Sequence, residues 1–128
     1  MELKKIKEIE EEIINEFDMF EDWVDKYNYI IELGKRLDIL DESKKIDNNL
    51  IEGCQSRVWL YSYYEDGKVY YKADSDAIIT KGLIGLLIRV LSGREPEEII
   101  NWDINFVDRL GLREHLSPTR SNGLMSMI

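Results

Sequence analysis

The sequence predicts an α+β domain in which helices pack on a small antiparallel sheet of about three strands. Three patterns predict this class: two amphipathic stretches at the start of the chain, two aromatic runs that flank one Asp-Gly pair, and a long apolar stretch after them. The length of 128 residues fits one domain, since domains cluster at roughly 100–150 residues. We therefore expect a single domain, 1–128.

Two helices are predicted first, over residues 3–17 and 21–37. Apolar side chains recur in both stretches at steps of three and four, which is the spacing of one helix face. Asp22 or Glu21 could cap the second helix, and Gly34 weakens its last turn. The short connection suggests an antiparallel helical hairpin.

An aromatic β-hairpin is predicted next. Residues 57–64 are rich in strand formers, Asp66-Gly67 is a strong two-residue turn signal, and residues 68–73 pair back. Both faces of the first strand are large and mostly apolar, so we expect it to be covered on both sides. Residues 46–51 are the candidate third strand.

The longest apolar stretch, Ala77–Leu91, predicts a central buried helix. Residues 74–76 are all of N-cap type, so the helix should start there, and Gly93 should end it. Gly82 and Gly85 are unfavourable inside a helix, and we interpret them as a sign of close packing on the sheet.

Three short helices are predicted in the remaining chain. Pro96 opens the first of them, because proline is favoured at the first helical position. Residues 104–110 form the second, which Gly111 ends. Ser117-Pro118 places a cap before a first-turn proline and begins the last helix.

The charge pattern excludes some partners. A net charge of −9 argues against nucleic acid, whose binding depends on Lys and Arg. The longest apolar stretch contains Lys81 and Arg89 and is shorter than the ~20 residues of a membrane span, so no membrane partner is expected. Residues 8–25 contain nine acidic residues and no basic one. They form either a solvated helix face or a surface that attracts a basic partner protein.

Cys54 is the only cysteine and His115 the only histidine. These counts are too small for a structural zinc site or an iron–sulfur cluster, so no metal and no cofactor is expected. A free thiol suits a reducing compartment, and we expect a cytoplasmic protein. Its position after Gly53 and before a strand fits an exposed reactive thiolate and a small buried hydrophobe equally well.

Three motifs occur in order along the chain. The first is Gly53-Cys54-Gln55-Ser56-x-Val58-Trp59. The second runs from Ala73 to Leu83 as Ala-Asp-Ser-Asp-Ala-Ile-Ile-x-Lys-Gly-Leu, and the third from Leu110 to Leu124 includes His-Leu-Ser-Pro-x-Arg and Asn-Gly-Leu. With these motifs the chain resembles the SufE family, which includes CsdE, over about residues 15–128.

The resemblance implies a sulfur acceptor for a pyridoxal-phosphate cysteine desulfurase of the SufS or CsdA type. It implies that Cys54 takes the terminal sulfur of the desulfurase persulfide and passes it to an iron–sulfur scaffold that contains SufB. It also implies the fold of the IscU scaffold. A carrier with one thiol fits this role, because a second thiol would discharge the persulfide as a disulfide.

The resemblance also implies roles for residues around Cys54. Gly53 gives the loop its backbone freedom, Gln55 and Ser56 shape the loop, and residues 58–60 are candidate walls around the sulfur. Arg120 matches a position near the partner interface, where its cation could stabilise a thiolate or pair with a desulfurase carboxylate. An ordinary surface ion pair is an equally good interpretation of Arg120.

The sequence is also compatible with other functions. One alternative is a regulatory module that binds a desulfurase without carrying sulfur. A peroxide-reactive thiol is another, although only Arg57 provides a nearby cation in the sequence. A thiol hydrolase would need His115 within reach of Cys54.

Overall fold

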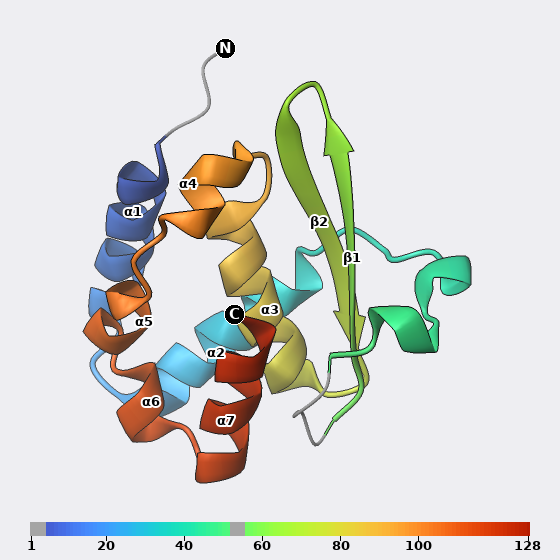
Figure 1. Cartoon of the computed structure of the whole chain (residues 1–128). Coiled ribbons are helices and arrows are strands. Elements are labelled where there is room, and N and C mark those ends of the chain that lie inside the picture. The colour runs from blue at the N-terminus through green and yellow to red at the C-terminus, as the bar shows by residue number, and fades with distance from the viewer. Residues whose placement is uncertain (1–4, 52–55) are drawn as a thin grey trace.

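The structure is a computed structural model that describes residues 5–51 and 56–128. Helix α3 (Ile78–Leu91) lies between a β-hairpin, made of β1 (Val58–Glu65) and β2 (Lys68–Ser75), and helices α1 and α5 (Figure 1). The other helices and turns are α1 (Ile6–Asp18), α2 (Trp23–Lys35), η1 (Glu42–Lys44), η2 (Asp47–Asn49), α4 (Pro96–Ile100), α5 (Asn105–Arg109), α6 (Leu112–His115) and α7 (Pro118–Met127). The predicted α+β class is confirmed.

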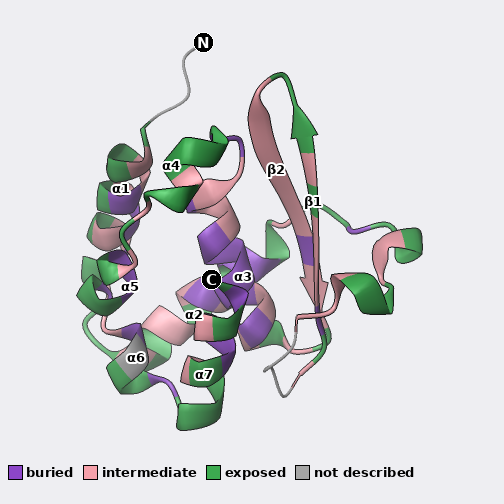
Figure 2. Ribbon diagram, in the orientation of Figure 1, coloured by how far each residue is buried: buried purple, intermediate pink, exposed green. Residues whose placement is uncertain are grey.

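Helix α3 forms the centre of the core, as its apolar composition predicted. Its buried residues are Thr80, Gly82, Leu83, Ile84, Gly85, Leu86, Leu87 and Val90, and Figure 2 shows the buried colour concentrated along it. The inner face of the hairpin contributes Val58 and Ala73, and α1 contributes Ile13 and Phe17, all of them buried. The prediction of a central buried helix is confirmed.

Glycines hold α2 and α3 in close contact. A Cβ atom at Gly82 would overlap the carbonyl oxygen of Ile30 in α2, and one at Gly34 would lie 2.8 Å from the backbone nitrogen of Gly82. A Cβ atom at Gly85 would lie 3.2 Å from the carbonyl oxygen of Leu33. The prediction that Gly82 and Gly85 face the sheet is therefore wrong, because they face a neighbouring helix.

The sheet has two antiparallel strands and a two-residue turn. Asp66 and Gly67 have φ angles of 51° and 81°, the left-handed values that such a turn requires. The register pairs Val58 with Ser75 and Glu65 with Lys68. The hairpin prediction is confirmed. The first strand is shifted by one residue, and the second ends at Ser75, two residues later than predicted.

The third strand is reduced to a single bridge between Leu50 and Trp59. Residues 46–51 were expected to form it, but Asp47, Asn48 and Asn49 make the 3-10 turn η2 instead. Asp and Asn are depleted in strands and favour turns, which explains the correction. The opposite edge of the sheet also carries one bridge, between Val69 and Arg94.

The hairpin is covered only in part. On its outer face, the Lys44 ammonium lies 4.4 Å from the centroid of the Tyr61 ring, and that of Lys45 lies 5.7 Å from Trp59. Towards the tip, Ser62 is exposed and Tyr64 is 67% exposed. The expectation that the first strand is covered on both sides fails for this half.

The first residue of a helix is set by side-chain capping in α2 and α7 and by strand pairing in α3. Asp22 caps α2 by accepting from the Asp25 N–H at 2.9 Å, and Ser117 caps α7 by accepting from the Arg120 N–H at 3.3 Å. The predicted start of α3 at residues 74–76 is wrong. Asp74 and Ser75 stay in β2 because they pair with β1, and α3 begins at Ile78.

Helices α1 and α2 do not form the predicted antiparallel hairpin. Helix α2 instead crosses α3, its main packing partner, and α1 lies on the far side of α3 from the sheet (Figure 1). The glycine contact explains this outcome, because it draws α2 onto α3 at backbone distance. Short connections predict neighbouring helices only where no closer contact competes.

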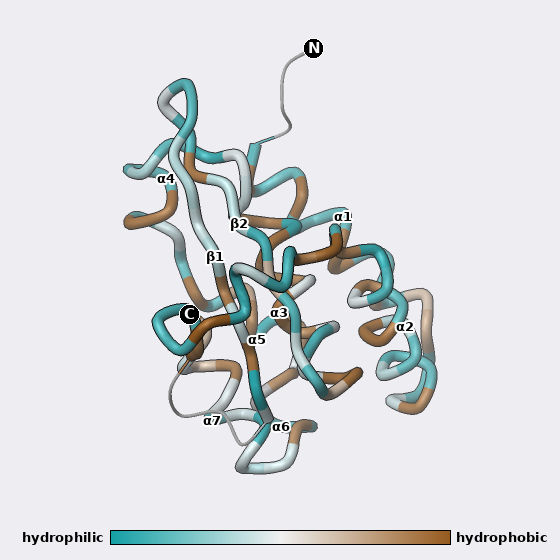
Figure 3. The backbone as a smooth tube through the Cα atoms, turned by 90° about the vertical axis from the view of Figure 1, so that its right-hand side faces the viewer, coloured by the Kyte–Doolittle hydropathy of each residue, from teal (hydrophilic) through white to brown (hydrophobic). Residues whose placement is uncertain are grey.

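Helices α1 and α2 are amphipathic, as their sequence patterns predicted. Figure 3 shows hydrophobic and hydrophilic colours alternating along α1 and α2. The buried apolar side chains are Ile13 and Phe17 in α1 and Ile30 and Leu33 in α2. Amphipathic helices of this kind bury one face against a neighbouring element. The predicted face of α1 includes its buried Ile13 and Phe17. In α2 the prediction included the buried Ile30 but missed Leu33 and Gly34.

Candidate functional site

A cleft of about 440 Å³ opens where α3 and α7 begin. Its lining comes from three segments: Ser56 before β1, the start of α3 (Ala77, Ile78, Ile79, Thr80 and Leu83), and α7 (Thr119, Arg120, Gly123 and Met127). The structure thus brings together Ser56 and Arg120, two residues of separate motifs. Candidate walls 58–60 are not part of this lining.

Three features of the cleft favour an anion, although the Asp76 carboxylate lies at its rim. Both helices point their N-termini at it, and a helix N-terminus carries about half a positive charge. The cap residue of α3, Ala77, supplies no side-chain acceptor, so the first backbone N–H groups of α3 remain available for an anion. Within the described ranges Arg120 forms no ion pair, and its side chain is exposed.

Hydrogen bonds to the backbone of Arg57 and Val58 fix the chain at the rim of the cleft. The Asp76 carboxylate accepts from the Arg57 N–H at 3.1 Å, and the Ser75 hydroxyl donates to the Arg57 carbonyl at 2.7 Å. On the other side, the Ile51 N–H donates to the Val58 carbonyl at 2.9 Å. Both flanks of residues 52–55 are therefore anchored.

The predicted nucleophile, Cys54, and its neighbours Gly53 and Gln55 lie outside the described residues. Ser56 is the first described residue after them and lines the cleft, half-buried. The chain reaches Ser56 from Cys54 in two residues, which span at most about 7 Å.

Asp74 connects three segments next to the cleft. Its carboxylate lies 2.8 Å from the Lys45 ammonium, before the cysteine segment, and 3.2 Å from that of Lys81 in α3. Burial raises the pKa of Asp74, but hydrogen bonds from Lys45, the Ser75 N–H and Lys81 outweigh it and leave the pKa below its ordinary value. Asp74 therefore stays ionised, and the expectation that it caps α3 is wrong.

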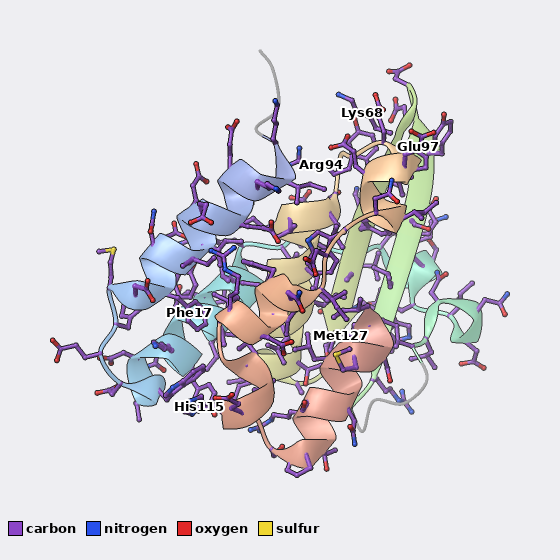
Figure 4. All side chains as sticks on the ribbon, turned by 60° about the vertical axis from the view of Figure 1, so that its left-hand side comes forward. Phe17, Lys68, Arg94, Glu97, His115 and Met127 are labelled. Carbon is purple, nitrogen blue, oxygen red and sulfur yellow. The ribbon has the colours of Figure 1, made fainter. Side chains whose placement is uncertain are left out.

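His115 lies away from the cleft lining. Its imidazole stacks on the indole of Trp23 with the ring centroids 4.1 Å apart, and its carbonyl accepts from the Tyr27 hydroxyl. Figure 4 shows His115 on the same side as Phe17, away from Met127 of the cleft. This geometry offers no support for a His115 base in the cleft.

The sequence prediction missed most of the cleft walls. Ile78 belonged to the predicted buried helix, yet it is 66% exposed at the cleft. Thr119, Gly123 and Met127 recur every four residues, the spacing of one helix face. That spacing could have predicted that these three residues share one face of α7.

Residues 5–51 and 56–128 contain neither a metal-ligand cluster nor a membrane-spanning helix. Among these residues, no three His, Cys, Asp or Glu side chains are grouped closely enough to hold a metal ion. Within the same ranges, no helix combines the length and hydropathy needed to cross a bilayer.

Comparison with known proteins identifies the family. Residues 11–128 match the model of the SufE Fe-S metabolism associated domain. An uncharacterized SufE-like protein of Rhizobium meliloti (strain 1021) is 38% identical over 123 residues, which cover 92% of this chain and 88% of that protein. SufE-like protein 1, chloroplastic/mitochondrial, of Arabidopsis thaliana is 41% identical over 119 residues.

The similar proteins differ in how much of their own length is matched. The match to the Arabidopsis protein covers 92% of this chain but only 32% of that protein. The solution structure of a hypothetical protein from Thermus thermophilus superimposes with a TM-score of 0.75 at 21% identity, and covers 93% of this chain and 87% of that one. That structure supports the fold alone. The family model and the two SufE-like relatives show that this chain belongs to the SufE family of proteins associated with Fe–S metabolism.

Proposed function

We propose that this protein accepts sulfur on Cys54 from a pyridoxal-phosphate cysteine desulfurase and delivers it to an iron–sulfur scaffold that contains SufB. The observation that carries the proposal is the cleft lined by Ser56, two residues after Cys54 in the sequence, where the N-termini of α3 and α7 converge with Arg120. An association with Fe–S metabolism follows from the family itself.

The transfer is an exchange at sulfur. The Cys54 thiolate attacks the terminal sulfur of the donor persulfide, a new S–S bond forms to Cys54, and the old S–S bond breaks. Its electron pair leaves with the donor thiolate, so no external oxidant or reductant is needed. The proton lost by the Cys54 thiol goes to solvent before the attack.

The cleft favours both charged forms of the carrier. Cationic groups and helix N-termini lower the pKa of a thiol, which raises the fraction of nucleophilic thiolate. The same groups stabilise the persulfide anion after transfer. The apolar floor, formed by Leu83 and Met127, would limit access of water and soluble thiols to the bound sulfur.

Intact-mass measurement after incubation with a desulfurase and free cysteine tests the proposal. We expect the wild-type chain to gain the mass of a sulfur atom, and the gain to disappear on treatment with a reducing thiol. Cys54→Ser is the control, and it should gain nothing because it contains no other cysteine.

The same experiment distinguishes a sulfur carrier from a regulatory module that binds the desulfurase without carrying sulfur. A protein that increases desulfurase turnover but gains no sulfur would support that alternative. An equal gain on Cys54→Ser would also exclude Cys54 as the carrier.

A further inference from the structure

The corner between α1 and α2 exposes large apolar side chains; residues 18–25, from the last residue of α1 to the first turn of α2, are called the turn. Met19 is 79% exposed and Val24 is 68% exposed, and the half-buried Phe20 and Trp23 lie in the same turn. Isolated apolar side chains on a surface are normal, whereas a group of them marks an interaction site.

Carboxylates border this apolar group. Asp18, Glu21, Asp22 and Asp25 are all exposed, and none of them takes part in an ion pair within the described part of the chain. The one base of the region, Lys26, holds its ammonium 4.9 Å from the centroid of the Trp23 ring. An apolar centre with a charged rim has the composition of a protein interface.

The acidic residues of α1 differ from those of the turn. Glu11 lies 2.9 Å from Arg109, and Glu16 lies 2.6 Å from Arg89. Glu10 accepts from the Trp102 indole N–H at 3.1 Å. The acidic run of the sequence is thus partly used inside the fold, and its uncompensated charge is concentrated at residues 18–25.

The turn continues into the surface that borders the cleft. Trp23 stacks on His115 of α6, and α6 leads through the exposed Ser117 to Thr119 and Arg120 at the cleft. Figure 1 shows α6 beside α7 at the lower side of the molecule, and Figure 2 shows exposed residues along both helices. A partner that reaches the cleft from this side would also meet the turn.

We infer that residues 18–25 form a docking surface for a basic, apolar-anchored face of the sulfur-donating desulfurase, contiguous with its contact at the cleft. The inference rests on the proposed function, because the desulfurase is the partner that must approach the cleft. Met19 and Val24 supply the anchors, and the carboxylates select a basic partner and accelerate its approach.

Binding of a SufS-type desulfurase to the full chain tests the inference. In Asp18→Asn/Asp25→Asn, we expect Kd to rise about fivefold at low salt, mainly through a slower association rate, and the salt dependence of binding to weaken. Asp22 is left unchanged because it caps α2. In Met19→Ser/Val24→Ser, we expect Kd to rise about tenfold through faster dissociation.

Each variant has a matched control. Glu8→Gln/Glu97→Gln removes the same charge from exposed sites on α1 and α4, and Figure 4 labels Glu97 far from His115. Ile39→Ser/Ile100→Ser removes exposed apolar side chains, 93% and 80% exposed, outside the turn. Both controls should bind like the wild type, and circular dichroism should show that all four variants are folded.

Sulfur gain is measured on the same samples at saturating desulfurase. Weaker binding of the turn variants, with normal sulfur gain at saturation, supports the docking surface. Equal affinities of turn variants and controls overturn it, even where the wild type gains sulfur. A wild type that binds through the turn but gains no sulfur overturns the carrier function and leaves the surface supported. A wild type that does not bind overturns both.

Discussion

Helix α3 contacts α2 and α1 in two physically different ways. On the α2 side, Gly34 and Gly82 bring the two backbones together, with no room for a Cβ atom. On the α1 side, Arg89 of α3 contacts Glu16 at 2.6 Å and the Tyr29 hydroxyl of α2 at 3.1 Å. The contact with α2 depends on backbone shape, whereas α1 adds a charge contact to the packing of its buried Ile13 and Phe17.

The difference shows which contact determines the position of α3. Overlap with a backbone carbonyl cannot relax by a rotamer change, so the glycine contact fixes the helix spacing closely. Charge pairs on partly exposed side chains tolerate movement and are screened by salt. Since the first turn of α3 lines the cleft, we expect the glycine contact to control the cleft walls. The charge contact should add a smaller, salt-dependent term to the apolar packing of α1.

Gly82→Ala should give the largest effect on stability. The new Cβ atom would overlap the Ile30 carbonyl, and we expect a loss of about 3 kcal/mol in the free energy of unfolding, at the top of the overpacking range. Urea unfolding followed by circular dichroism measures the loss. Gly85→Ala is the control, because its Cβ atom would lie 3.2 Å from the Leu33 carbonyl and alanine gains about 1 kcal/mol of helix propensity. Equal losses in both variants would contradict the glycine contact.

Glu16→Gln should give a smaller loss, of about 1 kcal/mol at low salt, because the variant removes the charge but keeps the shape. The loss should shrink in about 1 M salt, where screening acts over roughly 3 Å. Glu32→Gln removes an exposed pair with Lys35 at 3.1 Å and should change stability by less than about 0.5 kcal/mol. A loss at Glu16 that does not depend on salt would mean that the contact is not electrostatic.

The elements that depend on local signals could be predicted from the sequence. Asp66-Gly67 determines a hairpin turn without help from the rest of the chain, because both residues must adopt positive φ angles. Asp22 and Ser117 cap the helices that follow them. The start of α3 could not be predicted from local signals. Asp74 and Ser75 could either cap a helix or extend the strand, and in the structure they pair with β1.

Contacts between distant segments were beyond local patterns. Gly82 and Gly85 signalled a close approach, but their spacing does not reveal whether a strand or a helix approaches. The meeting of Ser56 and Arg120 at one cleft depends on how α7 packs beside α3. In the sequence, the two residues were linked only because both belong to SufE-like motifs. That resemblance suggested a shared site, but it gave no physical reason for their proximity.

The pH dependence of the Glu16 contribution distinguishes the charge contact from packing. Burial raises the pKa of Glu16, but hydrogen bonds from Arg89 and Tyr29 outweigh it, so the pKa of Glu16 in the folded chain is below its ordinary value. The contribution is therefore complete above the ordinary range of a glutamate and is lost as pH falls through the lowered pKa. The stability difference between wild type and Glu16→Gln should vanish in acid. A difference that persists below the lowered pKa would point to packing.

Glu10→Gln should give the smallest effect, with the opposite sign. Burial raises the pKa of Glu10, and the hydrogen bond from Trp102 offsets this only in part. A raised pKa means that the folded chain binds the proton more tightly than the unfolded chain, so the ionised carboxylate opposes folding at neutral pH. Glutamine keeps an oxygen for the Trp102 N–H and removes the charge. We therefore expect the free energy of unfolding to rise by less than about 1 kcal/mol at pH 7, and this gain to disappear in acid.

Urea unfolding at pH 7 and in acid measures the gain in the Glu10→Gln variant. The control is Glu8→Gln, at an exposed site on the same helix. A loss of stability at pH 7 would show that the Arg109 charge, which lowers the pKa of Glu10, outweighs burial, and would make Glu10 a second member of the charge contact.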